Sequence, residues 1–122
     1  MAAIIRPARK QDFAALIDEP LPYRVKAFAV EDEGKLLGVG GFAYQPGGTI
    51  AAFVLKGEGA ERYPLALHRA GLYAMAEARR EGFRRVVALA ETNNPAAERW
   101  LQRLGFELVM TNGERAWVWE RK

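Results

Sequence analysis

The stretch from residue 84 to 106, RRVVALAETNNPAAERWLQRLGF, constrains the fold more than any other. It begins with an uninterrupted apolar run, 86–90, which has the length of a strand buried on both faces. Asn94 and Pro95 then mark a helix start, because an asparagine side chain accepts from the open amides of the first turn and proline lacks one of those amides. Gly105 suits the left-handed position that ends a helix. The stretch therefore predicts a strand, a helix and a second strand.

The predicted helix has one apolar face. Ala97, Trp100, Leu101 and Leu104 recur at the i, i+3, i+4 and i+7 spacing of a helix of about three turns. Phe106 starts the strand that follows. The stretch contains no combination of nucleophile, acid and base.

Composition excludes several classes of protein. The chain has 122 residues, so we expect a single domain, 1–122. It has no cysteine, which excludes disulfides, thiolate zinc sites and a cysteine nucleophile, and its one histidine is His68. The net charge is +3 and the sequence pI is about 9.4, which is too mild an excess for a polybasic nucleic-acid binder. We expect neither a metal nor a nucleic-acid partner.

No targeting or membrane segment is visible in the sequence. The apolar start is too short for the core of a signal peptide. The longest apolar run, 50–55, is far below the length that spans a bilayer. We therefore expect a cytoplasmic protein without a membrane partner.

Turn signals divide the rest of the chain into short elements. Asp12 can cap a first helix, Pro46-Gly47-Gly48 and Asn112-Gly113 are turn sequences, and the glycines at 38, 40 and 41 predict a bulge or a close backbone approach. We expect strands at 4–5, 26–31, 35–44, 49–56, 86–90, 106–110 and 115–120, and helices at 13–17, 64–81 and 95–104. The predicted class is α/β, with a mixed sheet of six or seven strands and three helices.

Two motifs resemble the GNAT family of N-acetyltransferases. Asn94-x-x-Ala97-x-x-x-Leu101-x-x-x-Gly105-Phe106 is similar to the family's C-terminal motif, N-x-x-A-x-x-x-Y-x-x-x-G-F, with leucine in place of the tyrosine. The opening IIRPARKQDFAAL resembles I-R-P-A-x-x-x-D-x-x-x-L. The resemblance implies the GNAT-like acyl-CoA N-acyltransferase fold, here in a short member in which the second of the two early helices is abbreviated or lost.

The resemblance also implies a cofactor and a place for it. GNAT enzymes transfer an acetyl group from acetyl-CoA to an amine, and the backbone of their fourth strand pairs with the pantetheine arm. Their pyrophosphate loop reads R/Q-x-x-G-x-G/A, which registers here on Arg62-x-x-Leu65-x-Leu67, so both small positions are leucine. The implied site for acetyl-CoA or CoA comprises Phe53, Val54, Leu55, Arg62, Leu65, Leu67 and Asn94.

The catalytic residues stay unassigned. The fourth strand has no carboxylate, so the nearest candidates for a general base are Glu58 and Glu91, each of which is also an ordinary surface residue. Tyr63 or Tyr73 could replace the missing tyrosine, although a tyrosine in an amphipathic helix usually belongs to the core. His68 could contact phosphate, but partial burial in packing is the more common role of a lone helical histidine.

Two functions from different classes remain open. The first is a CoA-dependent N-acetyltransferase with a degenerate site, acting on a small-molecule or protein amine, because proximity alone supplies much of amine acetylation. The second is a non-catalytic binding or assembly module, similar to small phage-encoded GNAT-like proteins, some of which are virion-associated. Trp117 and Trp119 share a face of the last strand, where core packing is favoured over a ligand platform, and that strand could also pair in a homodimer.

Overall fold

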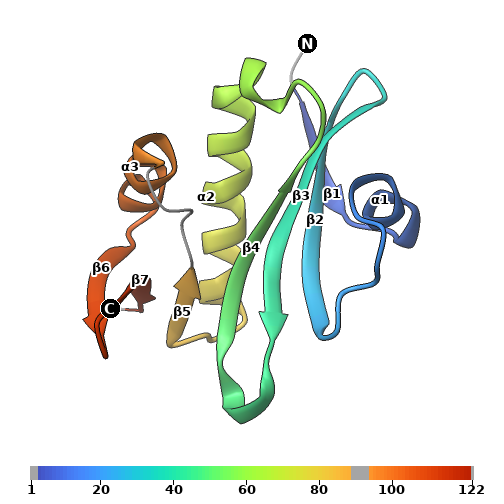
Figure 1. Ribbon diagram of the computed structural model, residues 1–122. Coiled ribbons are helices and arrows are strands. Elements are labelled where there is room, and N and C mark those ends of the chain that lie inside the picture. The colour runs from blue at the N-terminus through green and yellow to red at the C-terminus, as the bar shows by residue number, and fades with distance from the viewer. Residues whose placement is uncertain (1–2, 89–93, 122) are drawn as a thin grey trace.

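The computed structural model describes residues 3–88 and 94–121, which form a seven-stranded sheet and three α-helices (Figure 1). The strands are β1 Ile4–Pro7, β2 Arg24–Asp32, β3 Lys35–Tyr44, β4 Ile50–Lys56, β5 Arg85–Ala88, β6 Glu107–Thr111 and β7 Glu114–Glu120. The helices are α1 Lys10–Leu16, α2 Pro64–Arg80 and α3 Pro95–Arg103, with short 3-10 turns η1 Pro46–Gly48 and η2 Ala60–Arg62. The predicted class and the predicted element order are confirmed.

The sheet is mixed, with the strand order β1-β2-β3-β4-β5-β7-β6. Every neighbouring pair is antiparallel except β4 and β5, which are parallel and are connected through α2. A parallel pair needs a long crossover, and the strand, helix and strand between residues 50 and 88 supply it. A strand, a long helix and a buried strand in succession are the sequence pattern of such a parallel crossover.

Among the described residues, β4 and β5 pair at two positions only. The ladder consists of Ala51 opposite Val87 and Ala52 opposite Ala88. β4 continues to Lys56 and stays paired with β3 throughout, since Lys56 lies opposite Gly38. Residues 53–56 therefore have a strand neighbour on the β3 side only, within the part of the chain that the structure describes.

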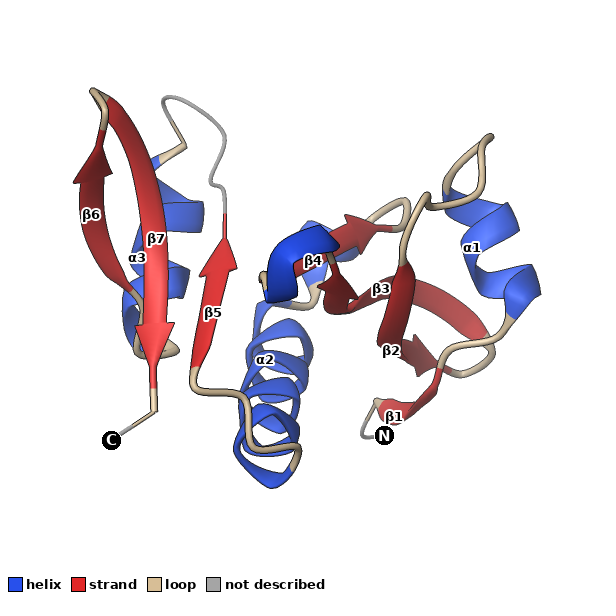
Figure 2. Ribbon diagram, turned by 90° about the horizontal axis from the view of Figure 1, so that it is seen from below, coloured by secondary structure: helices blue, strands red, loops and turns tan. Residues whose placement is uncertain are grey.

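Helices cover both faces of the sheet (Figure 2). Phe42 of β3 and Ala52 of β4 are cross-strand partners and pack against the core beneath α2 and α3. Phe53 is the next residue along β4, so its side chain points to the opposite face. There it packs against Phe13 of α1, with ring centroids 6.4 Å apart.

The main core lies between the sheet and the pair α2 and α3. Its buried members are all apolar: Phe42, Met75, Ala78, Val86, Ala88, Phe106, Trp117 and Trp119. Both tryptophans of β7 are 4% exposed, so the expectation that they belong to the core is confirmed. Arg79 lies over the ring of Trp119 at 5.4 Å, which adds a cation–π contact at the end of α2.

The ends of α3 are as the sequence predicts. Asn94 is the N-cap, and its Oδ1 accepts from the amide of Ala97 at 3.1 Å. At the other end Gly105 has φ +101°. The amide of Phe106 donates to the carbonyl of Leu101 at 3.0 Å, which is the bond that defines a Schellman C-cap.

The start of α1 differs from the prediction. The helix begins at Lys10, and Asp12 lies in its first turn instead of capping it. The Asp12 carboxylate accepts from the amide of Arg9 at 2.7 Å, so it satisfies an amide at the helix start from inside the helix. Residues 17–23 contain no second helix, as the short spacing predicted.

The glycines of β3 are required by close backbone approaches. A Cβ on Gly41 would lie 2.1 Å from the carbonyl oxygen of Lys26, and one on Gly38 would lie 2.9 Å from that of Leu55. The β2–β3 register also shifts between Val30 and Glu31, which is the predicted bulge. The predicted 112–113 hairpin is confirmed by φ values of +52° and +79°, the pattern of a type I′ turn.

Candidate functional site

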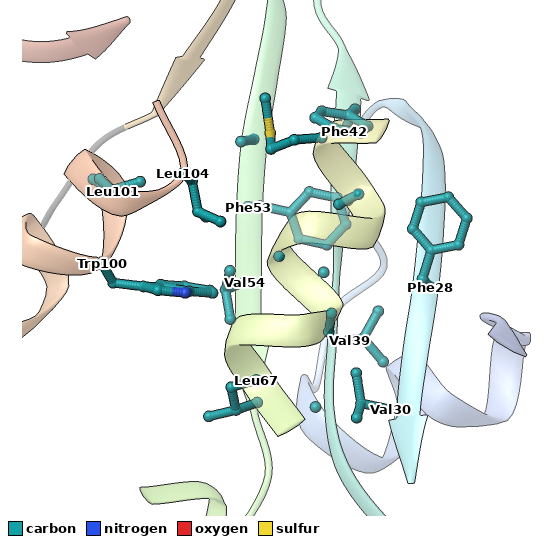
Figure 3. A pocket seen from close by; sticks show the side chains of 18 of the residues that line it. Phe28, Val30, Val39, Phe42, Phe53, Val54, Leu67, Trp100, Leu101 and Leu104 are labelled. Atoms are coloured by element: carbon teal, nitrogen blue, oxygen red, sulfur yellow. The ribbon is translucent and has the colours of Figure 1, made fainter. Parts of the chain in front are cut away.

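An apolar pocket of about 80 Å³ lies between β4, α2 and α3 (Figure 3). The sheet contributes its floor, and the two helices contribute the walls. The lining residues are apolar or glycine: Phe28, Val30, Gly38, Val39, Gly40, Gly41, Phe42, Ala52, Phe53, Val54, Leu67, Ala70, Gly71, Ala74, Met75, Trp100, Leu101, Leu104 and Phe106.

Small residues shape this pocket. On α2 the residues that face it include Ala70, Gly71 and Ala74, so the helix surface is thin there. A Cβ on Gly71 would lie 3.0 Å from Cζ2 of Trp100 and 3.0 Å from Cδ1 of Leu104. The large side chains of α3 therefore pack directly on the backbone of α2.

The open side of β4 borders the pocket. Val54 lines it, and so does Phe53, although the ring of Phe53 packs against Phe13 on the other face of the sheet. Both residues follow Ala52, the last residue of β4 with a β5 partner among the described residues. Backbone groups of this segment that point away from β3 have no strand partner among the described residues. An extended ligand that carries amide groups could pair with them as an added strand would.

The N-terminus of α2 lies at the end of the loop that follows β4. Most amides there are already used. Those of Arg62, Tyr63 and Leu67 donate to carbonyl oxygens three or four residues earlier, at 3.1, 2.9 and 3.1 Å. Pro64 has no amide proton.

Two free donors remain at this helix end, the amides of Leu65 and Ala66. Neither has a hydrogen-bond partner among the described residues. Unpaired amides and the helix dipole together favour an anion at such a position. The loop therefore keeps the donors that an anion would need, although they are fewer than in a loop where every amide is free.

A second pocket, of about 300 Å³, lies beside the same helix end and next to β1. It has a mixed charge, because Arg62 and Arg69 line it together with Asp32. Leu65 also lines this second pocket and is 62% exposed.

The predicted cofactor residues thus fall into three groups. Phe53, Val54 and Leu67 line the apolar pocket, together with Leu101 at the position of the family's tyrosine. Arg62 and Leu65 line the second pocket. The other two line neither: Leu55 pairs with Val39 in the sheet, and the side chain of Asn94 caps α3.

The candidate acids and bases do not meet in the apolar pocket. None of its described lining residues is titratable. Glu58 is exposed in the loop after β4, and Glu91 lies outside the described residues. Tyr63 is the half-buried N-cap residue of α2, and Tyr73 packs edge-on against Phe28 with centroids 5.1 Å apart.

His68 is half-buried on α2, as expected for a packing residue. Its Nδ1 is buried and has no hydrogen-bond partner among the described residues.

One polar group in the pocket wall is not among the residues that the sequence predicts for the site. Trp100 was predicted as part of an apolar stripe, and its ring does line the pocket. Its Nε1, however, is buried and has no hydrogen-bond partner in the part of the chain that the structure describes. A signal was present in the sequence, since tryptophan is the only member of that stripe that carries a donor.

Three solved acetyltransferase structures have this architecture. The chain superposes on an N-acetyltransferase from Staphylococcus aureus Mu50 with a TM-score of 0.77, 17% identity and 100% of both chains covered. For a Bacillus subtilis acetyltransferase in complex with CoA the TM-score is 0.75, with 13% identity and coverage of 98% of this chain and 99% of the other. For a Salmonella typhimurium protein named as an acetyltransferase, with its cofactor acetyl-CoA, the values are 0.74, 20%, 98% and 94%.

The chain has the fold of the GNAT acetyltransferases. At these identities the likeness concerns the fold, and no protein-family model or curated protein sequence matches the chain. Across residues 3–88 and 94–121, no helix has the length and apolarity needed to cross a membrane. The same residues contain no group of three or more potential metal ligands.

Proposed function

We propose that the protein is an acyl-CoA-dependent N-acetyltransferase that transfers an acetyl group from acetyl-CoA to an amine. The observation that carries the proposal is the open side of β4. It begins after Ala52, the last residue of β4 with a β5 partner among the described residues, and it borders an apolar pocket. The N-terminus of α2, with two free amides, follows β4 in the chain after a short loop.

These parts fit the pieces of acetyl-CoA. The amides of the pantetheine arm can pair with the β4 backbone at 53–55, and the methylene groups of the arm can pack against Val54 and Leu101. The amides of Leu65 and Ala66 and the charge of Arg62 suit the diphosphate. Asn94 contributes by fixing the start of α3, the helix that forms one wall.

The chemistry that this site supports is transfer by proximity. The nitrogen of a neutral amine attacks the thioester carbonyl, the C–S bond breaks, and the nitrogen proton passes to solvent as the thiol forms. Holding the two reactants together supplies a large part of the rate without an acid or a base in the pocket. Leucine at 101 cannot donate a proton to the thiolate, so we expect a slower enzyme than GNAT members with tyrosine there.

Calorimetry with CoA and with acetyl-CoA tests the first half of the proposal. We expect measurable heat at millimolar ligand, and a thermal midpoint that rises with ligand concentration because only the folded protein binds. If a folded sample gives neither heat nor stabilisation, the acetyltransferase proposal is wrong. The non-catalytic module, of the kind seen in small phage-encoded GNAT-like proteins, then becomes the preferred function.

Thiol release tests the second half. The chain has no cysteine, so a thiol reagent reads free CoA without a background from the protein. Acetyl-CoA is incubated with a panel of small amines and lysine peptides, and hydrolysis without an amine is the control. Amine-dependent thiol release identifies the acceptor class. CoA binding with no release for any amine would support a binding module that keeps its cofactor.

A further inference from the structure

The indole N–H of Trp100 is the one conventional hydrogen-bond donor among the side chains known to line the apolar pocket. The other described lining residues carry aliphatic, aromatic or thioether side chains, or none. Nε1 of Trp100 is buried and has no hydrogen-bond partner among residues 3–88 and 94–121. Buried tryptophan N–H groups usually find an acceptor, so an unpaired one in a pocket wall indicates that a ligand supplies it.

The indole is held in place by its packing. Trp100 extends from α3 towards α2 and β4, and Val54 lines the same pocket (Figure 3). Its Cζ2 packs against Gly71, where a Cβ would come within 3.0 Å. A glycine at this position of α2 is what allows the ring to lie so close to the helix. The donor is therefore fixed beside the open side of β4 instead of being free to turn to solvent.

The chemistry of the pocket restricts the acceptor. A carboxylate or phosphate would lose its hydration in a wall that offers no cation, which is a large cost. A neutral carbonyl oxygen on an otherwise apolar chain loses little hydration free energy and can accept the hydrogen bond from the indole N–H. The acyl-pantetheine arm carries such oxygens in its two amides and in its thioester.

We propose that Trp100 Nε1–H donates a hydrogen bond to a carbonyl oxygen of the acyl-pantetheine arm, so that Trp100 sets the position of that arm. This inference rests on the proposed function, because it takes CoA as the ligand of the pocket. Trp100 then contacts the arm from the α3 side of the pocket, while the β4 backbone pairs with the arm from the sheet.

Nitrogen-15 spectra of the indole N–H groups test the contact directly. The chain has three tryptophans, so three indole signals are expected, and the one that disappears in Trp100→Phe belongs to Trp100. Trp117 and Trp119 lie in the core and serve as internal controls. Formation of the hydrogen bond should move the Trp100 proton signal downfield and leave the other two in place.

Three ligands separate the sources of the carbonyl. Adenosine 3′,5′-bisphosphate has no arm, CoA has the two amides, and acetyl-CoA has the amides and the thioester. A downfield shift with CoA and acetyl-CoA identifies an amide oxygen, and a shift with acetyl-CoA alone identifies the thioester oxygen. The bisphosphate should leave the Trp100 signal unchanged.

The affinity of Trp100→Phe gives a second readout. Phenylalanine keeps an aromatic ring and removes the donor, so the Kd for CoA should rise about three- to tenfold. The Kd for adenosine 3′,5′-bisphosphate should stay the same, which shows that the helix end is intact. Equal losses for both ligands would indicate a general packing defect and would overturn the inference.

The outcomes distinguish the two proposals. If none of the three ligands binds, the proposed function fails and this inference fails with it. If CoA and acetyl-CoA bind while the Trp100 signal stays in place, only this inference is wrong.

Discussion

Gly71 of α2 and Trp100 of α3 are in direct contact, since a methyl group on Gly71 would come within 3.0 Å of Cζ2 of Trp100. Leu104 approaches the same point, with Cδ1 and Cδ2 at 3.0 and 3.1 Å. Three side-chain atoms of Trp100 and Leu104 therefore occupy the space that a Cβ on Gly71, in the middle of α2, would need. Glycine lowers helix stability at such a position, so its presence is explained by packing.

This contact makes Gly71→Ala informative. Alanine should gain about 1 kcal/mol in helix propensity but lose about 1–3 kcal/mol by overpacking against α3, so we expect net destabilisation of about 1 kcal/mol. Denaturant unfolding measures it. Adding Leu104→Ala to the same chain should remove part of the overpacking, so the two changes together should be non-additive. An increase in stability for Gly71→Ala alone would show that α3 moves away without cost.

The features that the sequence predicts well are those determined by neighbouring residues. β3 has the predicted bounds, and α3 has the predicted N-cap at Asn94 and the predicted end at Gly105. Each depends on turn or capping chemistry within a few positions. α1 was predicted less well, because Asp12 can act either as the cap residue or from the first turn. The hydrogen bonds from the Arg6 side chain and the Arg9 amide to the Asp12 carboxylate place Asp12 in the first turn.

The candidate site was harder to predict, because it depends on which face of a helix a residue occupies. The resemblance implies that Leu65 and Leu67 belong to the same pyrophosphate-binding loop. In this chain α2 already begins at Pro64, so these two residues point about 200° apart on the helix. Leu67 therefore lines the apolar pocket and Leu65 the second pocket. The unpaired N–H of Trp100 was equally hidden, since only the tertiary structure shows that it has no partner.

The ion pair between Arg6 and Asp12 should make stability depend on acid pH. Arg6 donates to the Asp12 carboxylate at 2.8 and 2.9 Å, and this contact lowers the pKa of Asp12 from 3.8 to about 2. Because the pKa is lower in the folded state, the contribution is present above pH 3.8 and is lost as the pH falls towards 2. A shift of this size corresponds to about 2 kcal/mol.

Asp12→Asn isolates this contribution. At pH 7 the variant should unfold about 2 kcal/mol more easily than the parent, and the difference should disappear near pH 2. Denaturant unfolding at a series of pH values measures both. A difference that stays constant between pH 7 and pH 2 would indicate lost packing and not lost charge.

Asn94→Ala should destabilise the protein by about 1 kcal/mol, because the amide of Ala97 loses its side-chain acceptor. The loss should occur with or without CoA, since the cap belongs to α3 itself. Asn94→Asp is the matched control. It keeps an acceptor and adds a charge that the helix N-terminus favours, so its unfolding midpoint should stay near that of the parent. An unchanged midpoint for Asn94→Ala would remove Asn94 as a structural cap.

The two leucines of the loop should differ in their effect on CoA binding. Leu67 lines the apolar pocket beside Val54, whereas Leu65 is 62% exposed and lines the second pocket. The resemblance implies a small residue at both positions. If bulk limits the cofactor site, Leu67→Ala should tighten CoA binding and Leu65→Ala should leave it unchanged. Alanine is preferred to glycine as the replacement, because it keeps the start of α2 helical.

Calorimetry of the two variants at two salt concentrations measures this difference. Binding should weaken with salt by the same factor in both, because the phosphate contacts are screened equally. Weaker binding by Leu67→Ala would mean that this side chain packs against the arm and contributes to affinity. Equal tightening in both variants would mean that either substitution changes the position of the free amides of Leu65 and Ala66 at the N-terminus of α2. The two faces of α2 would then not act separately on the cofactor.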